Sequence, residues 1–123
     1  MTLHACIEDL LVRGLDDWIQ AAEVASVSRT TGGAQSDEAS RDLSIRLIRK
    51  LLEDGLAEPG RVDEQVGFLP WGVPVDAAMQ RIESDWATKP VGPELGEICW
   101  LNLTKNGHAQ AQRLWSKKVG REG

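Results

Sequence analysis

SDEASRDLSIRLIRKLLED, residues 36–54, is the stretch around which the rest of this chain can be arranged, and Gly55 follows it. Ser36 predicts the start of a helix, because its side-chain oxygen can accept a hydrogen bond from a free N–H group of the first turn. Gly55 predicts the end, because glycine adopts the left-handed conformation that closes many helices. Apolar side chains cover roughly 200° of the helical wheel. The apolar positions are Leu43, Ile45, Leu47, Ile48, Leu51 and Leu52. So wide an apolar surface predicts a helix packed between two others, with Leu51 in the core.

The remaining arc of this helix carries charged residues of both signs. Asp42 and Arg46 are four residues apart, as are Arg49 and Glu53. Each pair can form an ion pair worth a few tenths of a kcal/mol along one face. The exposed face is therefore expected to be partly self-neutralised.

Two further helices are predicted before residue 36. The first ends at Gly14. The second is DWIQAAEVASVSR, residues 17–29, capped by Asp16 and carrying Trp18 on its apolar stripe. Residues 30–35 have the composition of a loop. Helix, short link, helix, loop and longer helix is the order typical of a helix-turn-helix core.

The segment after the central helix begins as a short strand candidate at residues 56–58, with a turn at Pro59-Gly60. Residues 61–71 show no periodicity. Pro74 suits the first position of a helix. Residues 75–87 then repeat apolar side chains at helical spacing.

The end of the chain predicts one strand and one helix. EICWLNL, residues 97–103, alternates apolar side chains, so we expect a strand with Trp100 in the core. Thr104 can cap a final helix that ends at residue 118. A frayed basic tail is expected at residues 119–123.

Two short segments carry a resemblance to a known fold. RLIRKLLEDGLAE resembles the recognition-helix-to-wing segment of winged-helix proteins, and LNLTKNGHAQAQ resembles the strand, Leu-Thr, Gly and helix ending of bacterial winged-helix regulators. GFLPWG and GEICWLNLTKNG are similar to stretches of small, uncharacterised bacterial single-domain proteins. The resemblance implies one α+β, mainly helical winged-helix (winged helix-turn-helix) domain over residues 1–123. Its expected parts are a three-helix core at 1–55, an enlarged wing with an extra helix and a small β-sheet at 56–103, a C-terminal helix at 104–118 and a tail at 119–123.

Composition narrows the class of protein. The net charge of −5 disfavours non-specific attraction to nucleic acid or anionic lipid. No apolar run approaches the length that spans a bilayer, and the N-terminus lacks a signal-peptide pattern, so no membrane association is expected. Cys6 and Cys99 are isolated, which favours a reducing cytoplasm.

Metal binding and catalysis find little support in the sequence. His4, Cys6, Cys99 and His108 are the available soft metal ligands, and their spacing matches no zinc motif. Thr31-Gly32-Gly33 lacks the lysine and the length of a phosphate-binding loop. We therefore expect a non-enzymatic protein with no metal, no cofactor and no small-molecule substrate.

Two binding functions remain. A winged-helix DNA-binding transcriptional regulator would use the cations of the central helix against phosphates and base edges. These candidate DNA contacts are Arg41, Arg46, Arg49 and Lys50, with Arg113, Lys117, Lys118 and Arg121 in the last helix and tail. Between Glu53 and Glu64, however, five acids stand against one base, and an acidic wing is poorly suited to phosphate contact.

The second binding function is recognition of a protein partner, which would use the acidic residues directly. The candidate contacts are Asp16, Asp17, Glu53, Asp54, Glu58, Asp63 and Glu64, together with Phe68 and Trp71, which either plug the core or anchor an interface. Acidic side chains around an aromatic centre suit an interface to a basic protein. The sequence thus favours a protein-binding module, with an immunity protein that neutralises a basic bacterial toxin as the concrete case and the DNA-binding regulator as the alternative.

Overall fold

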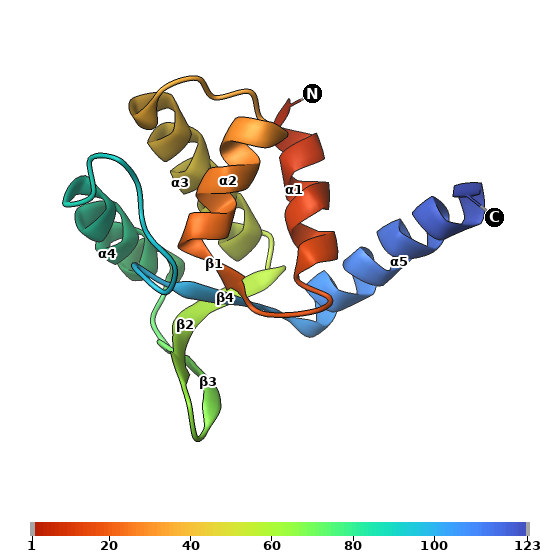
Figure 1. The fold of residues 1–123 in the computed structure, drawn as a ribbon. Helices are drawn as coiled ribbons and strands as arrows, with labels where there is room; N and C mark the ends of the chain where they lie inside the picture. Colours follow the sequence, from red (N-terminus) through yellow and green to blue (C-terminus); the bar gives the residue numbers. More distant parts are fainter. Residues whose placement is uncertain (1, 123) are drawn as a thin grey trace.

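The computed structural model describes the backbone of residues 2–122 and the side chains of residues 3–119. Within that range the protein is α+β, with five helices and one four-stranded antiparallel sheet (Figure 1). The helices are α1 (Thr2–Arg13), α2 (Ala21–Thr30), α3 (Asp37–Glu53), α4 (Val75–Ala87) and α5 (Lys105–Glu122). The strands are β1 (Ile19–Gln20), β2 (Ala57–Asp63), β3 (Gly67–Pro70) and β4 (Trp100–Leu103). The coarse prediction of a mainly helical α+β chain is confirmed.

Helix α3 is the centre of the fold, as its sequence predicts. The Ser36 side-chain oxygen accepts a hydrogen bond from the Ala39 N–H at 3.0 Å, and Gly55 has φ 69°. Leu47, Ile48 and Leu51 are fully buried. Helices α1, α2 and α4 all contact α3. The wide apolar arc is thus explained by contact with three helices.

The sheet has the strand order β1-β4-β2-β3, so β4 lies between the first and the second strand. Helices α1 to α4 lie on one side of it, and the hairpin of β2 and β3 extends away from them (Figure 1). Side chains of β4 alternate accordingly. Leu101 and Leu103 are buried toward the helices, whereas Trp100 and Asn102 are half-buried on the other side. The expectation that Trp100 is a core residue was wrong, because its position in the alternation places it opposite the helical layer.

The second helix begins four residues later than the sequence suggests. Residues 19–20 are extended and pair with β4, and the Ala21 N–H donates to the Cys99 carbonyl at 3.2 Å. Asp16 therefore does not cap α2. The Asp17 carboxylate instead accepts a hydrogen bond from the Trp18 N–H at 2.7 Å. Pairing with β4 has overridden the local helical pattern, and Trp18 is therefore not on the apolar stripe of the second helix where it was expected.

The hairpin also differs from its prediction. Strand β2 continues through Pro59-Gly60, and the turn lies at residues 64–66. The Asp63 carboxylate forms this turn by accepting hydrogen bonds from the Gln65 and Val66 N–H groups, at 2.8 and 3.0 Å. The Phe68 ring lies across Gly60, and a Cβ on Gly60 would lie 2.6 Å from the Phe68 Cζ. Glycine therefore leaves room for the ring at this position of the strand. Gly60, which with Pro59 was expected to form a turn, here permits a close contact with the Phe68 side chain.

The chain enters β4 through a tight turn, so this strand begins at Trp100 and not at residue 97. The Cys99 N–H donates to the Glu97 carbonyl at 2.9 Å, with Ile98 at φ 71° between them. This is a γ-turn of the rarer, strained kind. Thr104 caps α5 as predicted, accepting a hydrogen bond from the Gly107 N–H at 3.1 Å.

Helix α4 has the bounds that the sequence predicts, whereas helix α5 ends later than predicted. Helix α4 spans Val75–Ala87, as its apolar periodicity predicts. Helix α5 continues to Glu122, beyond the expected end at residue 118. None of the helices in residues 2–122 combines the length and the apolar character that crossing a membrane requires.

Candidate functional site

Aromatic side chains gather on the side of the sheet that faces away from helices α1 to α4. The Trp18 and Phe68 rings are 6.3 Å apart between centroids and tilted by 32°. Trp18 also approaches the hairpin backbone, since a Cβ on Gly67 would lie 3.7 Å from its ring. Trp100 lies opposite Gly60, the residue that the Phe68 ring crosses. Residues from three separate parts of the chain therefore meet here, and all three rings are half-buried.

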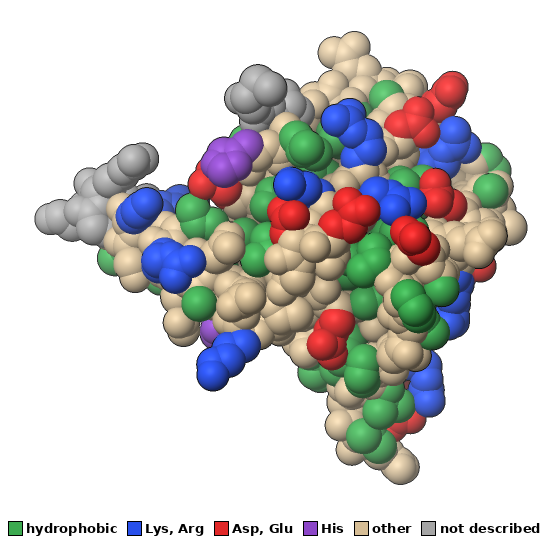
Figure 2. Space-filling view, turned by 180° about the vertical axis from the view of Figure 1, so that it is seen from behind, with side chains coloured by type: hydrophobic (Ala, Val, Ile, Leu, Met, Phe, Trp, Pro, Cys, Tyr) green, Lys and Arg blue, Asp and Glu red, His purple; other side chains and the backbone are tan. Residues whose placement is uncertain are grey.

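Polar side chains lie beside these rings. Glu58 is directly opposite Asn102 in the β2–β4 ladder, so the two side chains share the outer side of the sheet. We call Trp18, Glu58, Phe68, Trp100 and Asn102 the open sheet face. Figure 2 shows hydrophobic side chains along the projecting hairpin that carries part of this surface.

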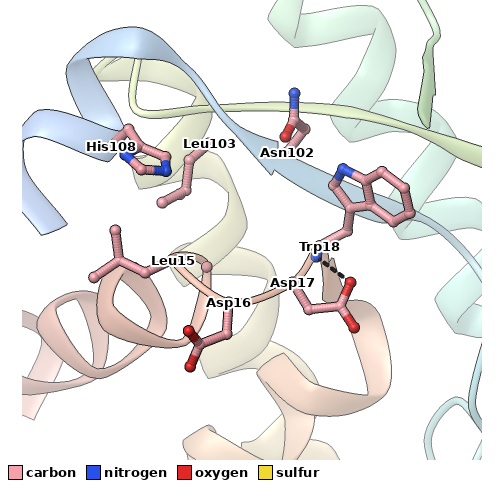
Figure 3. A pocket seen from close by; sticks show the side chains of 8 residues that line it. Leu15, Asp16, Asp17, Trp18, Asn102, Leu103 and His108 are labelled. Atoms are coloured by element: carbon pink, nitrogen blue, oxygen red, sulfur yellow. Dashed lines mark hydrogen bonds between the residues drawn. The ribbon is translucent and has the colours of Figure 1, made fainter. Parts of the chain in front are cut away.

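A hollow of about 370 Å³ adjoins the open sheet face (Figure 3). Trp18 stands on one side, Leu103 and His108 stand on the other, and the loop with Asp16 and Asp17 closes the lower edge. Gly14 makes the close fit possible, because a Cβ there would lie 2.7 Å from the Leu103 side chain. The hollow is too polar and too open to resemble an enclosed small-molecule site.

Three carboxylates beside or on the open sheet face have no cation next to them in the described part of the chain. Among the described side chains, Asp16, Asp17 and Glu58 have no Lys, Arg or His nitrogen within 4.0 Å. Asp63 and Glu64 lie at the tip of the hairpin, where hydrogen bonds from the Gln65 and Val66 N–H groups hold the pKa of Asp63 below its usual value. These acids offer negative charge to a cationic partner, and Arg61 is the hairpin cation that lies close enough to Asp63 to lower its pKa further.

Three residues predicted as partner contacts lie elsewhere. Glu53 and Asp54, at the end of α3, pair with Arg49 at 3.5 Å and Lys50 at 3.0 Å. Trp71 packs against the core, with the Arg81 guanidinium of α4 3.9 Å from its ring centroid. Trp71 thus plugs the junction of the hairpin and α4, and the structure does not bring these residues to the open sheet face.

Helix α4 lies against α3, the helix that carries the candidate DNA contacts. Arg49 of α3 reaches Asp76 at 3.5 Å and Glu83 at 3.9 Å, both on α4, besides Glu53 on its own helix. Its guanidinium is therefore surrounded by carboxylates. A phosphate would have to displace them to bind.

Two of the other three cations of α3, Arg41 and Lys50, are also paired with acids. Arg41 pairs with Asp42 at 3.5 Å and Lys50 with Asp54 at 3.0 Å. The predicted pair of Asp42 with Arg46 is absent, because Asp42 turns to Arg41 instead. Arg46 itself is exposed. The exposed face of α3 thus alternates in sign and has no basic patch.

Basic side chains instead gather on α5. Figure 2 shows Lys and Arg along this helix, away from the mixed charges of the helical body. Arg113, Lys117 and Lys118 are exposed, whereas the side chain of Arg121 lies outside those the structure describes.

The soft ligands remain scattered. Among the described residues, no group of three or more His, Cys, Asp or Glu side chains could hold a metal ion. Cys6 and Cys99 are buried free thiols. Burial raises the pKa of Cys99 to about 12 and, with the nearby Asp9 carboxylate, raises the pKa of Cys6. Both thiols are therefore protonated and poorly nucleophilic at neutral pH.

The chain matches no protein-family model, and neither the curated proteins nor the solved structures include a significant match to it. Interpretation of the site therefore depends on its own geometry. Trp18, Trp100 and Asn102 were not among the predicted contacts. The alternation of residues 97–103 does put Trp100 and Asn102 on one side of a strand, but no sequence signal showed that helices would leave that side uncovered.

Proposed function

We propose that this protein is a non-enzymatic binding module that recognises a basic protein through the open sheet face. The observation that carries the proposal is a half-exposed pair of aromatic rings, Trp18 and Phe68, beside Asp16, Asp17 and Glu58, whose carboxylates have no cation within 4.0 Å among the side chains that the structure describes. Aromatic side chains supply much of the binding energy at protein interfaces. Unpaired carboxylates speed the encounter with a basic partner and fix its register.

The proposal includes a winged-helix interpretation of the fold. It is supported by the chain order of helix, short strand, helix, helix and strand, and by the placement of β4 between β1 and β2. The hairpin of β2 and β3 then corresponds to the wing, and α4 to an addition within it. On this interpretation, residues 1–123 form one domain that uses the outer side of its sheet and wing for binding.

A concrete partner is a basic bacterial toxin, for which this protein would act as an immunity protein. It would neutralise the toxin by covering its working surface, without chemistry. The cytoplasm is the proposed location, since Cys6 and Cys99 are free thiols and disulfides are rare in that compartment.

The alternative, a DNA-binding regulator, is supported by the same order of elements. It is disfavoured by α4 lying against α3 and by the carboxylates around Arg49 and Lys50. Phosphate contacts dominate DNA affinity, so we expect weak and salt-sensitive binding at most. A sequence-specific mobility shift that Arg46→Ala abolishes at physiological salt would favour the regulator.

Capture from the native cell tests the proposal. Immobilised wild-type protein should retain a basic protein that Trp18→Ala retains much less. Trp115→Ala is the matched control, because it also removes a partly exposed indole, but on α5 and away from the face. Equal retention by all three proteins would refute the assignment of the face, and recovery of DNA without protein would refute the function.

A further inference from the structure

The hollow beside the open sheet face is bounded by three separate parts of the chain. The loop before β1, the end of β4 and the start of α5 each supply part of its lining, around a volume of about 370 Å³ (Figure 3). Gly14 fits closely against Leu103, and the Trp18 ring lies 6.3 Å from the Phe68 ring between centroids. Because these contacts fix the walls in advance, little order has to be created when a group from a partner enters.

The charge around the hollow favours a cation. Asp16 and Asp17 line it, and among the described side chains neither has a Lys, Arg or His nitrogen within 4.0 Å. The Asp17 carboxylate accepts the Trp18 N–H with one oxygen, at 2.7 Å, which leaves its second oxygen for a ligand. Lys105, at the start of α5, lines the neighbouring hollow of about 440 Å³ and not this one. A positive group that enters therefore meets two carboxylates and displaces no ion pair of theirs.

Apolar surface and neutral acceptors complete the lining. Trp18 and Leu103 stand on opposite sides of the hollow. The carbonyl oxygen of Asn102 and, in the neutral ring, one nitrogen of His108 can accept further hydrogen bonds. Acceptors on a loop, a strand and a helix thus surround an apolar wall. A guanidinium suits such a lining, because it carries five donors in a rigid plane and packs on aromatic surface, whereas an ammonium is a compact and strongly hydrated charge.

We propose that the hollow takes one arginine side chain of the basic partner, with the stem against Trp18 and Leu103 and the guanidinium at the carboxylates of Asp16 and Asp17. This inference rests on the proposed function and adds which group of the partner is recognised. The stem of arginine buries apolar surface while its charged end stays at the polar edge. Lysine would bring the same charge without the planar set of donors, so the hollow discriminates between the two cations.

Titration of the full chain with arginine amide, acetylated on its α-amino group, tests the hollow without the partner. The indole N–H signals in NMR spectra report binding, and the signal missing from Trp18→Ala identifies Trp18. We expect this signal to shift saturably with a Kd of about 1–10 mM, and the matching lysine probe to bind at least about fivefold more weakly. The Trp115 signal, from α5, should stay unmoved. No shift of the Trp18 signal up to about 50 mM arginine probe, or equal binding of the two probes, would overturn the inference.

A pair of isosteric variants tests the role of the carboxylates. Asp16→Asn removes one charge from the lining of the hollow, and Glu38→Gln removes one charge from α3. Asp16→Asn should weaken binding of the arginine probe about threefold or more, since a charge-assisted contact is lost, while Glu38→Gln should leave it unchanged. Circular dichroism establishes that both variants are folded. Equal affinity of Asp16→Asn and the wild type would overturn the inference.

Substitution of arginine by lysine in the captured partner separates this inference from the proposed function. One such substitution should weaken binding to the wild type about tenfold or more, and it should have a smaller effect on binding to Asp16→Asn, because the two changes remove the same contact. A partner that Trp18→Ala fails to retain but that tolerates every arginine-to-lysine substitution would overturn the inference and leave the proposed function standing. Failure to capture any basic protein would refute the proposed function, whereas the titration would still decide which cation the hollow binds.

Discussion

The contact between Trp18 and Phe68 should be measurable as a coupling free energy in a double-mutant cycle. The four proteins are the wild type, Trp18→Ala, Phe68→Ala and the double variant. A centroid distance of 6.3 Å lies toward the long end of the range for interacting rings, which contribute about 0.5–1.5 kcal/mol beyond their buried area. We therefore expect a coupling of about 0.5–1 kcal/mol.

Urea denaturation followed by circular dichroism gives the four free energies of unfolding. Each single variant should cost less than the 3–5 kcal/mol typical of a buried aromatic, because both rings are half-buried. Phe68→Ala combined with Trp115→Ala is the control. Their effects should be additive within about 0.5 kcal/mol, because α5 and the hairpin project from the body in different directions (Figure 1). A coupling between Trp18 and Phe68 below about 0.3 kcal/mol would show that the hairpin does not fold against the loop before β1.

Other consequences concern the core, the start of α5 and the hairpin turn. Leu51→Ala should cost about 2–5 kcal/mol in urea denaturation, because Leu51 is fully buried, whereas Leu95→Ala should cost less than about 0.5 kcal/mol. Gly107→Ala should cost about 1–3 kcal/mol, because its Cβ would lie 1.9 Å from the Leu56 carbonyl oxygen and α5 would have to shift. Asp63→Ala should lower the melting temperature near pH 6. Because the folded-state pKa of Asp63 is lowered, this deficit should narrow as the pH falls below about 4, and a deficit that is constant with pH would refute the role of the carboxylate.

The sequence predicts the elements whose signals are local and repeated. Helix α3 has a capping Ser36, a closing Gly55 and an apolar arc, and all three act as predicted. Helix α4 is found at its predicted bounds because its apolar residues recur at helical spacing over 75–87. Agreement between capping and periodicity made these predictions sound.

Elements that depend on distant partners escaped prediction. Strand β1 has two residues and exists because β4, some eighty residues later, pairs with it. That pairing takes Trp18 out of α2 and turns it to the outer side of the sheet. Pro59-Gly60 was expected to be a turn. Gly60 instead lies within a strand, because a side chain at this position would collide with the Phe68 ring.

The candidate site was predicted only in part, for the same reason. Asp16, Asp17, Glu58 and Phe68 do lie close to or on one surface, as their charge and aromatic character suggested. The sequence leaves open whether Trp71 plugs the core or anchors an interface, and in the structure it faces the core and α4. Phe68 and Trp71 are three residues apart in an extended segment, so strand alternation puts them on opposite sides of the hairpin.

The proposed contact between the open sheet face and a basic protein is tested most directly by the association rate of the captured partner. Asp16→Lys with Glu58→Lys reverses one carboxylate of this face and one in the adjoining loop. Glu38→Lys with Glu83→Lys makes the same change in net charge on α3 and α4. Because opposite charges steer encounter over about a Debye length, the first variant should associate at least about tenfold more slowly than the wild type at low salt, and the difference should shrink as salt is added. The second variant should stay close to the wild type. Equal slowing by the two variants, or no slowing by the first, would contradict the account.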